Sequence, residues 1–418
     1  MRLSLETRES GLRRRSPWRG RAQARELLLR AALLDDERAR EAWLEFCSAF
    51  ALEDLPQGSY PLLPVLRERV VEWDDRDALL PRLSGISRHT WARNRVALRQ
   101  LAAALEALST ASVHALVYGD CALLLRYYRS LELRPMGRLD VLVRNEDVDE
   151  ALRALTLAGW VALASDPGRM FLRRHFVPLV GGSGFVLCLS GDFLPEVTPT
   201  RLLAASTASV WHASEAIDVL GQPARAPAPT HELLAACVRC PTTLSGRAQQ
   251  LLDAKWILKA RGSSVDWEQL VDEAAMRAAV LALRRLVSDL NDIDASLPLE
   301  LLARLRAQTV SAHDRLASGL GSLDSKAFGS LPHMLAGFLR SNSDRSIPGA
   351  LLGLPVFLRD AWDREHAWSV PAAATSRARS LVTREASRRP PEKGWRLAQS
   401  LVESSPTPTK QPRAAGPK

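Results

Sequence analysis

The stretch Arg134-Pro135-Met136-Gly137-Arg138-Leu139-Asp140-Val141-Leu142-Val143 is the most informative part of this sequence. Its second half is a short apolar run with β-branched members, which predicts a strand over 139–143. Residues i and i+2 of a strand lie on one face, so Arg138 and Asp140 are expected to point to the same side. The pattern therefore places a cation and an acid together on one face of a strand.

Two more strands are expected on either side of this one. Residues 113–118 form an apolar run that Gly119 ends, and residues 185–189 form another that the glycine-rich turn 181–184 introduces. Helical patterns at 121–128 and 146–158 lie between the strands. The order strand, helix, strand, helix, strand predicts a small α/β unit in the centre of the chain.

The rest of the chain has the periodicity of helices. Leu, Ala and Arg dominate the composition, and apolar residues recur at three and four positions. We therefore predict an α+β protein that is mostly helical, with a small mixed sheet flanked by helical segments. The predicted parts are a basic disordered arm (1–24), an N-terminal helical segment (25–110), the α/β core (111–198), a C-terminal helical domain (199–369) and a basic disordered tail (370–418).

The positive charge of the chain is concentrated at its two ends. Residues 1–25 carry eight arginines against two acids, and residues 371–418 carry ten basic residues against three acids. The net charge of +9 therefore leaves about −4 for the residues between them. Basic ends can contact nucleic acid, but the composition favours solvated tails over that partner.

Cysteine usage and hydropathy exclude several classes of protein. The five cysteines are scattered, and Cys237 and Cys240, which have the spacing of a metal or redox pair, have no second pair to complete a zinc site. They are predicted to be reduced thiols in a cytoplasmic protein. No run of apolar residues is long enough to span a membrane, so no membrane partner is expected.

The segment 134–143 resembles the signature of an uncharacterised bacterial nucleotidyltransferase family in the polymerase-beta-like superfamily. That signature runs Arg-Pro-Met, one or two variable residues, and then Asp-x-Asp before an apolar strand. Residues 85–94, 219–238 and 251–254 resemble other segments of the same family. The resemblance covers roughly residues 25 to 365 and implies a nucleotidyltransferase core within helical segments.

Such a family is expected to transfer a nucleoside monophosphate from a nucleoside triphosphate to an acceptor, which the sequence leaves unknown. The two acids of Asp-x-Asp point to one spot, and a third acid from a neighbouring strand completes a site for Mg²⁺. A glycine turn after the first strand lets backbone N–H groups approach the triphosphate. By resemblance, Gly119 is the nucleotide-binding turn and Asp140 is the catalytic, metal-binding acid.

Two of the three expected metal carboxylates are missing from this sequence. Arg138 occupies the position of the first acid, and Cys188 occupies the position of the third. Tyr118 replaces the lysine that usually precedes the turn glycine, and Arg239 replaces a histidine of the family. Asp140 is the one aligned metal ligand that remains, so Mg²⁺ is expected as a cofactor only if the site is active.

Three hypotheses follow for Arg138. It pairs with Asp140 on the strand, it binds phosphate directly in place of the metal, or a displaced acid, Asp120 or Asp192, sustains weak catalysis. The expected function is a nucleotidyltransferase-family protein with impaired catalysis, a pseudoenzyme. The alternative is a non-catalytic nucleotide-binding or scaffold protein of a biosynthetic pathway, and the sequence leaves open whether the chain is an enzyme.

Overall fold

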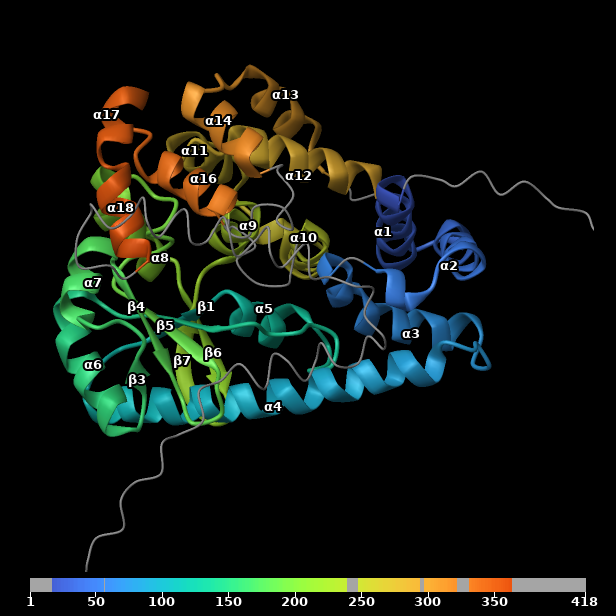
Figure 1. The fold of residues 1–418 in the computed structure, drawn as a ribbon, viewed down its shortest axis with the longest axis horizontal. Helices are drawn as coiled ribbons and strands as arrows, with labels where there is room; N and C mark the ends of the chain where they lie inside the picture. Colours follow the sequence, from blue (N-terminus) through green and yellow to red (C-terminus); the bar gives the residue numbers. More distant parts are fainter. Residues whose placement is uncertain (1–16, 56, 239–246, 294–296, 322–330, 363–418) are drawn as a thin grey trace, which may run out of the picture.

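The computed structural model describes residues 17–55, 57–238, 247–293, 297–321 and 331–362. Its centre is a seven-stranded mixed sheet with the strand order β3-β4-β5-β2-β1-β7-β6. Helices surround the sheet on all sides in Figure 1. The predicted fold class, a mostly helical α+β protein with a mixed sheet, is confirmed.

The N-terminal helices lie at one end of the molecule, and one of them is much longer than the others. Their bounds are α1 (Pro17–Leu33), α2 (Glu37–Ala49), α3 (Leu63–Trp73) and α4 (Leu80–Thr110), with short 3₁₀ turns at Leu52–Asp54 and Gln57–Leu62. Helix α4 has 31 residues and runs under the whole sheet as far as α6 (Figure 1). Helix α1 begins at Pro17, inside the stretch predicted to be a disordered arm, and residues 1–16 lie outside the described residues.

The core alternates strands and helices from Leu116 onward. Its elements are β1 (Leu116–Tyr118), α5 (Asp120–Tyr127), β2 (Leu139–Leu142), α6 (Val148–Leu157), β3 (Val161–Ala162), α7 (Pro167–Arg174), β4 (Phe176–Val180), β5 (Val186–Ser190), α8 (Leu203–His212), β6 (Glu215–Val219) and β7 (Gln222–Ala226). Strand β2 is antiparallel to β1 and parallel to β5, so it lies in the middle of the sheet.

The three predicted strands are present, but four others were not predicted. Strand β3 has only two residues, and β6 and β7 alternate half-buried with exposed residues, so none of them forms an apolar run. Strand β4 pairs with β5 through the hairpin at 181–184, where a turn was expected. Strands β6 and β7 belong to this sheet, although their residues fall in the segment predicted as the C-terminal helical domain.

After β7, the described residues of the C-terminal half form helices. Its helices are α9 (Pro229–Val238), α10 (Arg247–Arg261), α11 (Trp267–Met276), α12 (Val280–Asp292), α13 (Leu299–Ala307), α14 (Ala312–Gly321), α16 (Leu331–Ser341), α17 (Ile347–Leu352) and α18 (Leu354–Ala361). Cys240 and Arg239, like the predicted tail 370–418, lie outside the described residues.

Residues 267–290 have the periodicity of one continuous helix, but the structure divides them between α11 and α12. Ala278 adopts φ +50°, a left-handed conformation that ends α11 before α12 begins. The side chain of Arg277 at this break is fully buried, and it donates hydrogen bonds to Thr198, to Ser206 and to the Glu273 carboxylate. The buried arginine therefore attaches the break to the segment that follows β5 and to α8, and helical periodicity alone could not show this.

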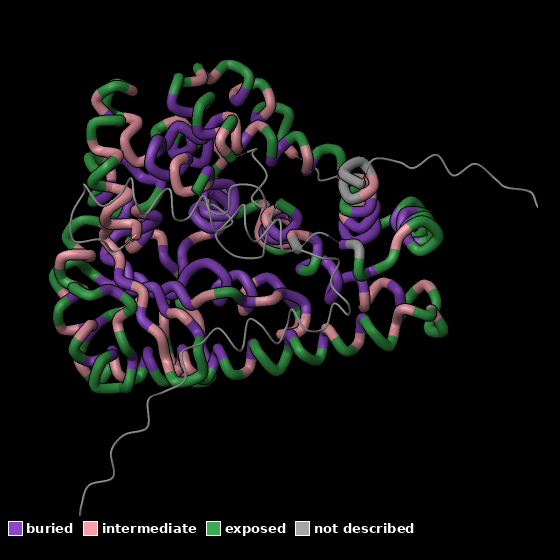
Figure 2. Tube along the Cα trace, viewed as in Figure 1, coloured by how far each residue is buried: buried purple, intermediate pink, exposed green. Residues whose placement is uncertain are grey.

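A single hydrophobic core joins the N-terminal helices, the sheet and the helices α9 to α13. Figure 2 shows the buried residues concentrated in the sheet and in the helices around it. Three tryptophans, Trp211, Trp256 and Trp267, pack against this core and are partly buried. The α/β unit and the surrounding helices are thus expected to fold together rather than as separate modules.

A close contact at the end of β5 requires glycine at position 191. A Cβ atom added to Gly191 would lie 2.5 Å from the Phe171 ring and within contact distance of the Asn145 side chain. We expect Gly191→Ala to lower the free energy of unfolding by about 1–3 kcal/mol because of this overlap. Gly85→Ala is the control, since nothing lies within 4 Å of that position in α4 and alanine favours a helix by about 0.5–1 kcal/mol. Urea denaturation of both variants checks this, and equal effects would contradict it.

A buried carboxylate joins the helical half to the core. Glu232 of α9 accepts hydrogen bonds from Arg126, at 2.7 Å, and from the Tyr127 hydroxyl, both on α5. Burial raises the pKa of Glu232 to about 7, even though the charge of Arg126 acts in the opposite direction. Glu215 of β6, which also pairs with Arg126 and with Arg261, has a lowered pKa because these cations outweigh its burial.

These two glutamates are expected to change stability with pH in opposite directions. Because the pKa of Glu232 is raised on folding, its contribution is complete below about pH 4.5 and is lost as the pH rises through 7. Relative to Glu232→Gln, the wild type should therefore lose roughly 3 kcal/mol of unfolding free energy between pH 4.5 and 8. Glu215→Gln should show the reverse trend, losing stability relative to the wild type toward neutral pH. Denaturation curves at several pH values test this, and parallel curves for wild type and Glu232→Gln would contradict it.

Candidate functional site

The arginine and the acid singled out in the sequence lie on the central strand β2. Asp140 is opposite Tyr118 of β1 on one side and opposite Cys188 of β5 on the other. Opposed residues of neighbouring strands share a face, so these side chains gather on one side of the sheet. This is the position where the predicted metal site would lie.

Arg138 and Asp140 form an ion pair. The Nε atom of Arg138 lies 2.7 Å from Oδ1 of Asp140, and the Asp140 side chain is completely buried. Burial alone would lower the pKa of Arg138, but the charge of Asp140 raises it well above its usual value. The first of the three hypotheses for Arg138, pairing with Asp140, therefore describes the structure.

A small pocket opens beside this pair. It is lined by Tyr118, Arg138, Phe176, Cys188, Ser190, Leu194, Pro195 and Glu196. The hydroxyl groups of Tyr118 and Ser190 lie 3.2 Å apart. Strand β5 supplies the pocket with a thiol and a hydroxyl group, but with no carboxylate.

The side chains at this position do not fit a magnesium ion. Mg²⁺ requires several oxygen ligands and is usually bound through one or two carboxylates. Here Asp140 already faces a guanidinium, and its neighbours on the adjacent strands are Tyr118 and Cys188. Within the part of the chain that the structure describes, no three His, Cys, Asp or Glu side chains gather to hold a metal.

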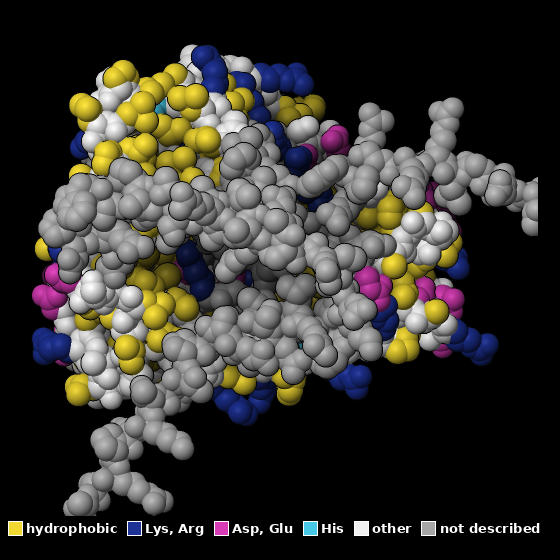
Figure 3. Space-filling view, viewed as in Figure 1, with side chains coloured by type: hydrophobic (Ala, Val, Ile, Leu, Met, Phe, Trp, Pro, Cys, Tyr) yellow, Lys and Arg dark blue, Asp and Glu magenta, His cyan; other side chains and the backbone are white. Residues whose placement is uncertain are grey.

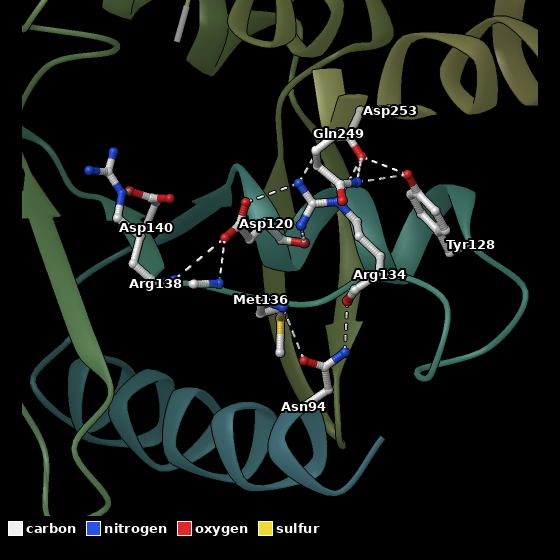
Figure 4. Close-up of polar contacts among 10 residues, drawn as sticks. Asn94, Asp120, Tyr128, Arg134, Met136, Arg138, Asp140, Gln249 and Asp253 are labelled. Atoms are coloured by element: carbon white, nitrogen blue, oxygen red, sulfur yellow. Dashed lines mark hydrogen bonds and ion pairs between the residues drawn. The ribbon is translucent and has the colours of Figure 1, made fainter. Parts of the chain in front are cut away.

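Asp120, the first residue of α5, makes its contacts with Arg134 and with the backbone amides that lead into β2. Its Oδ1 atom accepts a hydrogen bond from Arg134 at 3.0 Å, and its Oδ2 atom accepts one from the Gly137 amide at 2.8 Å. Figure 4 shows Asp120 between Arg134 and the chain at 137–138, with Arg138 and Asp140 to one side. The carboxylate thus attaches the loop before β2 to the start of α5.

Arg134 is the centre of a buried polar cluster. Only 2% of its surface is exposed, and it pairs with Asp120 and, at 2.7 Å, with Asp253 of α10. Asp253 also accepts hydrogen bonds from the Tyr128 hydroxyl and the Gln249 amide (Figure 4). Burial acts to lower the pKa of Arg134, but the two acids raise it well above its usual value.

Asn94 of α4 fixes the other side of the same loop. Its amide donates hydrogen bonds to the carbonyl oxygens of Leu131 and Arg134, and its carbonyl oxygen accepts one from the Met136 amide. The loop of residues 131–137 is therefore held from α4 below and from α10 above. This arrangement sets where β2 begins, and with it the position of Arg138 and Asp140.

Gly119 lies in the turn between β1 and α5, as expected. Its φ of +68° is a conformation that glycine adopts readily, and it is the N-cap residue of α5. The acid that follows it, Asp120, occupies the first turn of α5. Its negative charge is compensated by Arg134.

Asp192, the other acid proposed as a displaced ligand, has partners of its own. Its oxygens accept a hydrogen bond from the Thr207 hydroxyl at 3.0 Å and lie 2.9 Å from Nδ1 of His175. Burial would raise the pKa of Asp192, but the bonds from His175 and Thr207 lower it. The acid joins the ends of β4 and β5 to α8.

Sequence reasoning identified Arg138, Asp140, Asp120 and Gly119, but it missed the role of Arg134 and Asn94. Both occur in segments that carried the family resemblance, as does Asp253. The signal for their role was therefore present, but only the fold shows that the three segments meet. Glu196 at the pocket gave no signal, because it lies in a loop outside any motif.

The mixed sheet, the glycine turn before α5 and the acid on the adjacent strand agree with the nucleotidyltransferase core that the sequence predicted. The chain belongs to a family described as uncharacterised nucleotidyltransferase, whose model matches residues 61–291. Among solved structures, the antibiotic-resistance factor ANT(2'')-Ia is similar over 48% of this chain and 98% of its own, with 11% identity and a TM-score of 0.33. No curated protein matches the chain.

Because of the buried cluster, substitutions of Arg134 and of Arg129 are expected to differ widely in their effect on the free energy of unfolding. Arg134→Met leaves Asp120 and Asp253 buried without their cation, so we expect a loss of about 3–5 kcal/mol in unfolding free energy. Arg129→Met is the control, because Arg129 pairs with Glu68 at the surface, where such a pair contributes about 0–1 kcal/mol. Urea denaturation of the two variants tests this. A loss below 1 kcal/mol for Arg134→Met would show that the cluster does not hold the loop.

Proposed function

We propose that this nucleotidyltransferase-family protein does not catalyse metal-dependent nucleotidyl transfer, and that its core has a non-catalytic binding role. The observation that carries this proposal is the ion pair between Arg138 and the fully buried Asp140. The family implies a nucleoside triphosphate as ligand and Mg²⁺ as the ion that would assist its transfer. The acid that would bind the ion is neutralised by a neighbouring cation.

The positive charge of Arg138 repels a metal ion whatever the exact magnitude of the interaction. Two unit charges about 4 Å apart interact by roughly 4 kcal/mol at an effective dielectric constant of 20, so a divalent ion at that distance from Arg138 is repelled by roughly 8 kcal/mol. A metal would also have to displace Arg138 from a buried acid, and a buried charge without its partner is costly. Both effects oppose a metal at this position.

The displaced-acid hypothesis has less support. Asp120 would have to leave Arg134 and the Gly137 amide to become a ligand, and Asp192 would have to leave His175 and Thr207. Each change would leave a buried group without its hydrogen bond, and this would lower the stability of the protein by about 1–3 kcal/mol. Neither acid is placed on the strand beside Asp140.

A second candidate function, nucleotide binding through Arg138 without a metal, is favoured by one observation. Arg138 lines the pocket while its Nε atom faces Asp140, so part of its guanidinium remains available to a ligand. The planar guanidinium suits phosphate oxygens well.

Restoring the missing acids should restore metal binding. We expect Arg138→Asp combined with Cys188→Asp to bind Mn²⁺ at least tenfold more tightly than the wild type, because three carboxylates would then share one face. Arg306→Asp combined with Asn291→Asp changes the net charge equally on exposed positions and should leave Mn²⁺ affinity unchanged. Electron paramagnetic resonance titration of Mn²⁺ measures both.

An assay of nucleotidyl transfer by the wild-type protein tests the proposal directly. Labelled nucleoside triphosphates are incubated with the protein and a cell extract as the source of acceptor, with and without Mg²⁺. No transfer above the level of Asp140→Asn is expected. Mg²⁺-dependent labelling that Asp140→Asn abolishes would show that the wild-type site is active.

Nucleotide binding without transfer has its own test. ATP should raise the melting temperature of the wild type equally with and without Mg²⁺, since Arg138 rather than a metal would hold the phosphates. Arg138→Met combined with Asp140→Leu removes the pair without leaving a buried charge, and it should abolish the shift. A shift that requires Mg²⁺, or one that survives the double change, would contradict a role for Arg138.

A further inference from the structure

The outer face of α4 is unusually basic for a chain whose central part is slightly acidic. Residues 78–105 contain five arginines and no acid. Arg88 and Arg99 are exposed, Arg95 is half-buried, and Trp91 between them is 45% exposed. Lys and Arg side chains gather along the lower edge of the molecule in Figure 3, where α4 runs in Figure 1.

Four of these residues form one line along the helix. Arg88, Trp91, Arg95 and Arg99 are spaced by three or four positions, so they lie one above another on the same side. We call them the arginine stripe. The residues from 88 to 99 extend over about 16 Å. The side chains of Leu98, Leu101 and Leu105, on a neighbouring side of α4, are buried in the core, so the stripe runs along the edge of the exposed face of the helix.

The charges of the stripe are not compensated within the described part of the protein. Arg88, Arg95 and Arg99 make no ion pair with any described residue, whereas Arg82 near the start of α4 pairs with Glu53 at 2.6 Å. Arg95 lies over the Trp91 ring at 5.4 Å from its centre. The stripe thus combines three available guanidinium groups with one exposed aromatic ring.

We propose that the arginine stripe binds a single-stranded segment of nucleic acid. Guanidinium groups pair with phosphate oxygens, and an exposed aromatic ring offers a platform on which an unpaired base stacks. The three guanidinium groups are spread over about 16 Å, so they can contact successive phosphates along one strand. A membrane surface fits less well, because the apolar face of α4 is buried in the core and cannot enter lipid.

Binding is tested with the full chain and a fluorescently labelled, unstructured 20-nucleotide RNA or DNA, by fluorescence anisotropy. Arg88→Gln, Arg95→Gln and Arg99→Gln together should weaken binding about tenfold or more and reduce the slope of log affinity against log salt by about 2. Trp91→Ala should weaken binding while leaving that slope unchanged, because a stacked base releases no counterions.

The matched control is Arg285→Gln, Arg306→Gln and Arg315→Gln together, exposed arginines of α12, α13 and α14. This control variant loses the same charge as the stripe variant and keeps both basic ends of the chain. Its affinity for the oligonucleotide should therefore stay close to that of the wild type. Equal losses in the two triple variants would show that net charge or the chain ends hold the strand, and this would overturn the proposal. A second result would also overturn the proposal. In that result the oligonucleotide does not bind, but vesicles of anionic phospholipid bind in a way that depends on the stripe. Circular dichroism melting of each variant confirms that it is folded.

Discussion

The structure depends on one buried cation, Arg134. A loop before the central strand has no regular hydrogen bonding of its own, so its position must be set by side chains. Arg134 sets it by pairing with Asp120 of the core and Asp253 of the helical half, while Asn94 holds the loop from below. Three segments that are far apart in the sequence thus meet at one guanidinium, and the strand that carries Arg138 and Asp140 starts from that point.

The signature segment 134–143 therefore contains residues of two kinds. Arg134 and Met136 belong to the network that positions the strand, and they match the family pattern. Arg138 departs from the pattern that the sequence predicted, and in the structure it pairs with Asp140. The residues of the segment that hold the loop and the residue that faces the pocket thus have separate contacts. The chain matches its family over residues 61–291, a range that contains both kinds of residue.

The sequence predicted the elements that have strong local patterns and missed those that depend on distant partners. The strands at Leu116, Leu139 and Val186 are apolar runs, and they were found. Strands β6 and β7 were missed because they expose every second residue. At the site, the spacing of Arg138 and Asp140 was enough to predict that they share a face. Their contact at 2.7 Å, and the attachment of Asp120 to Arg134, depend on side-chain positions that spacing does not specify.

The ion pair on β2 also couples positions 138 and 140. Replacement of Arg138 alone by an acid would set two carboxylates side by side in the interior. Such a variant would be less stable than the present protein, because buried like charges repel. A change at one of the two positions therefore requires a matching change at the other, and neither residue can vary independently.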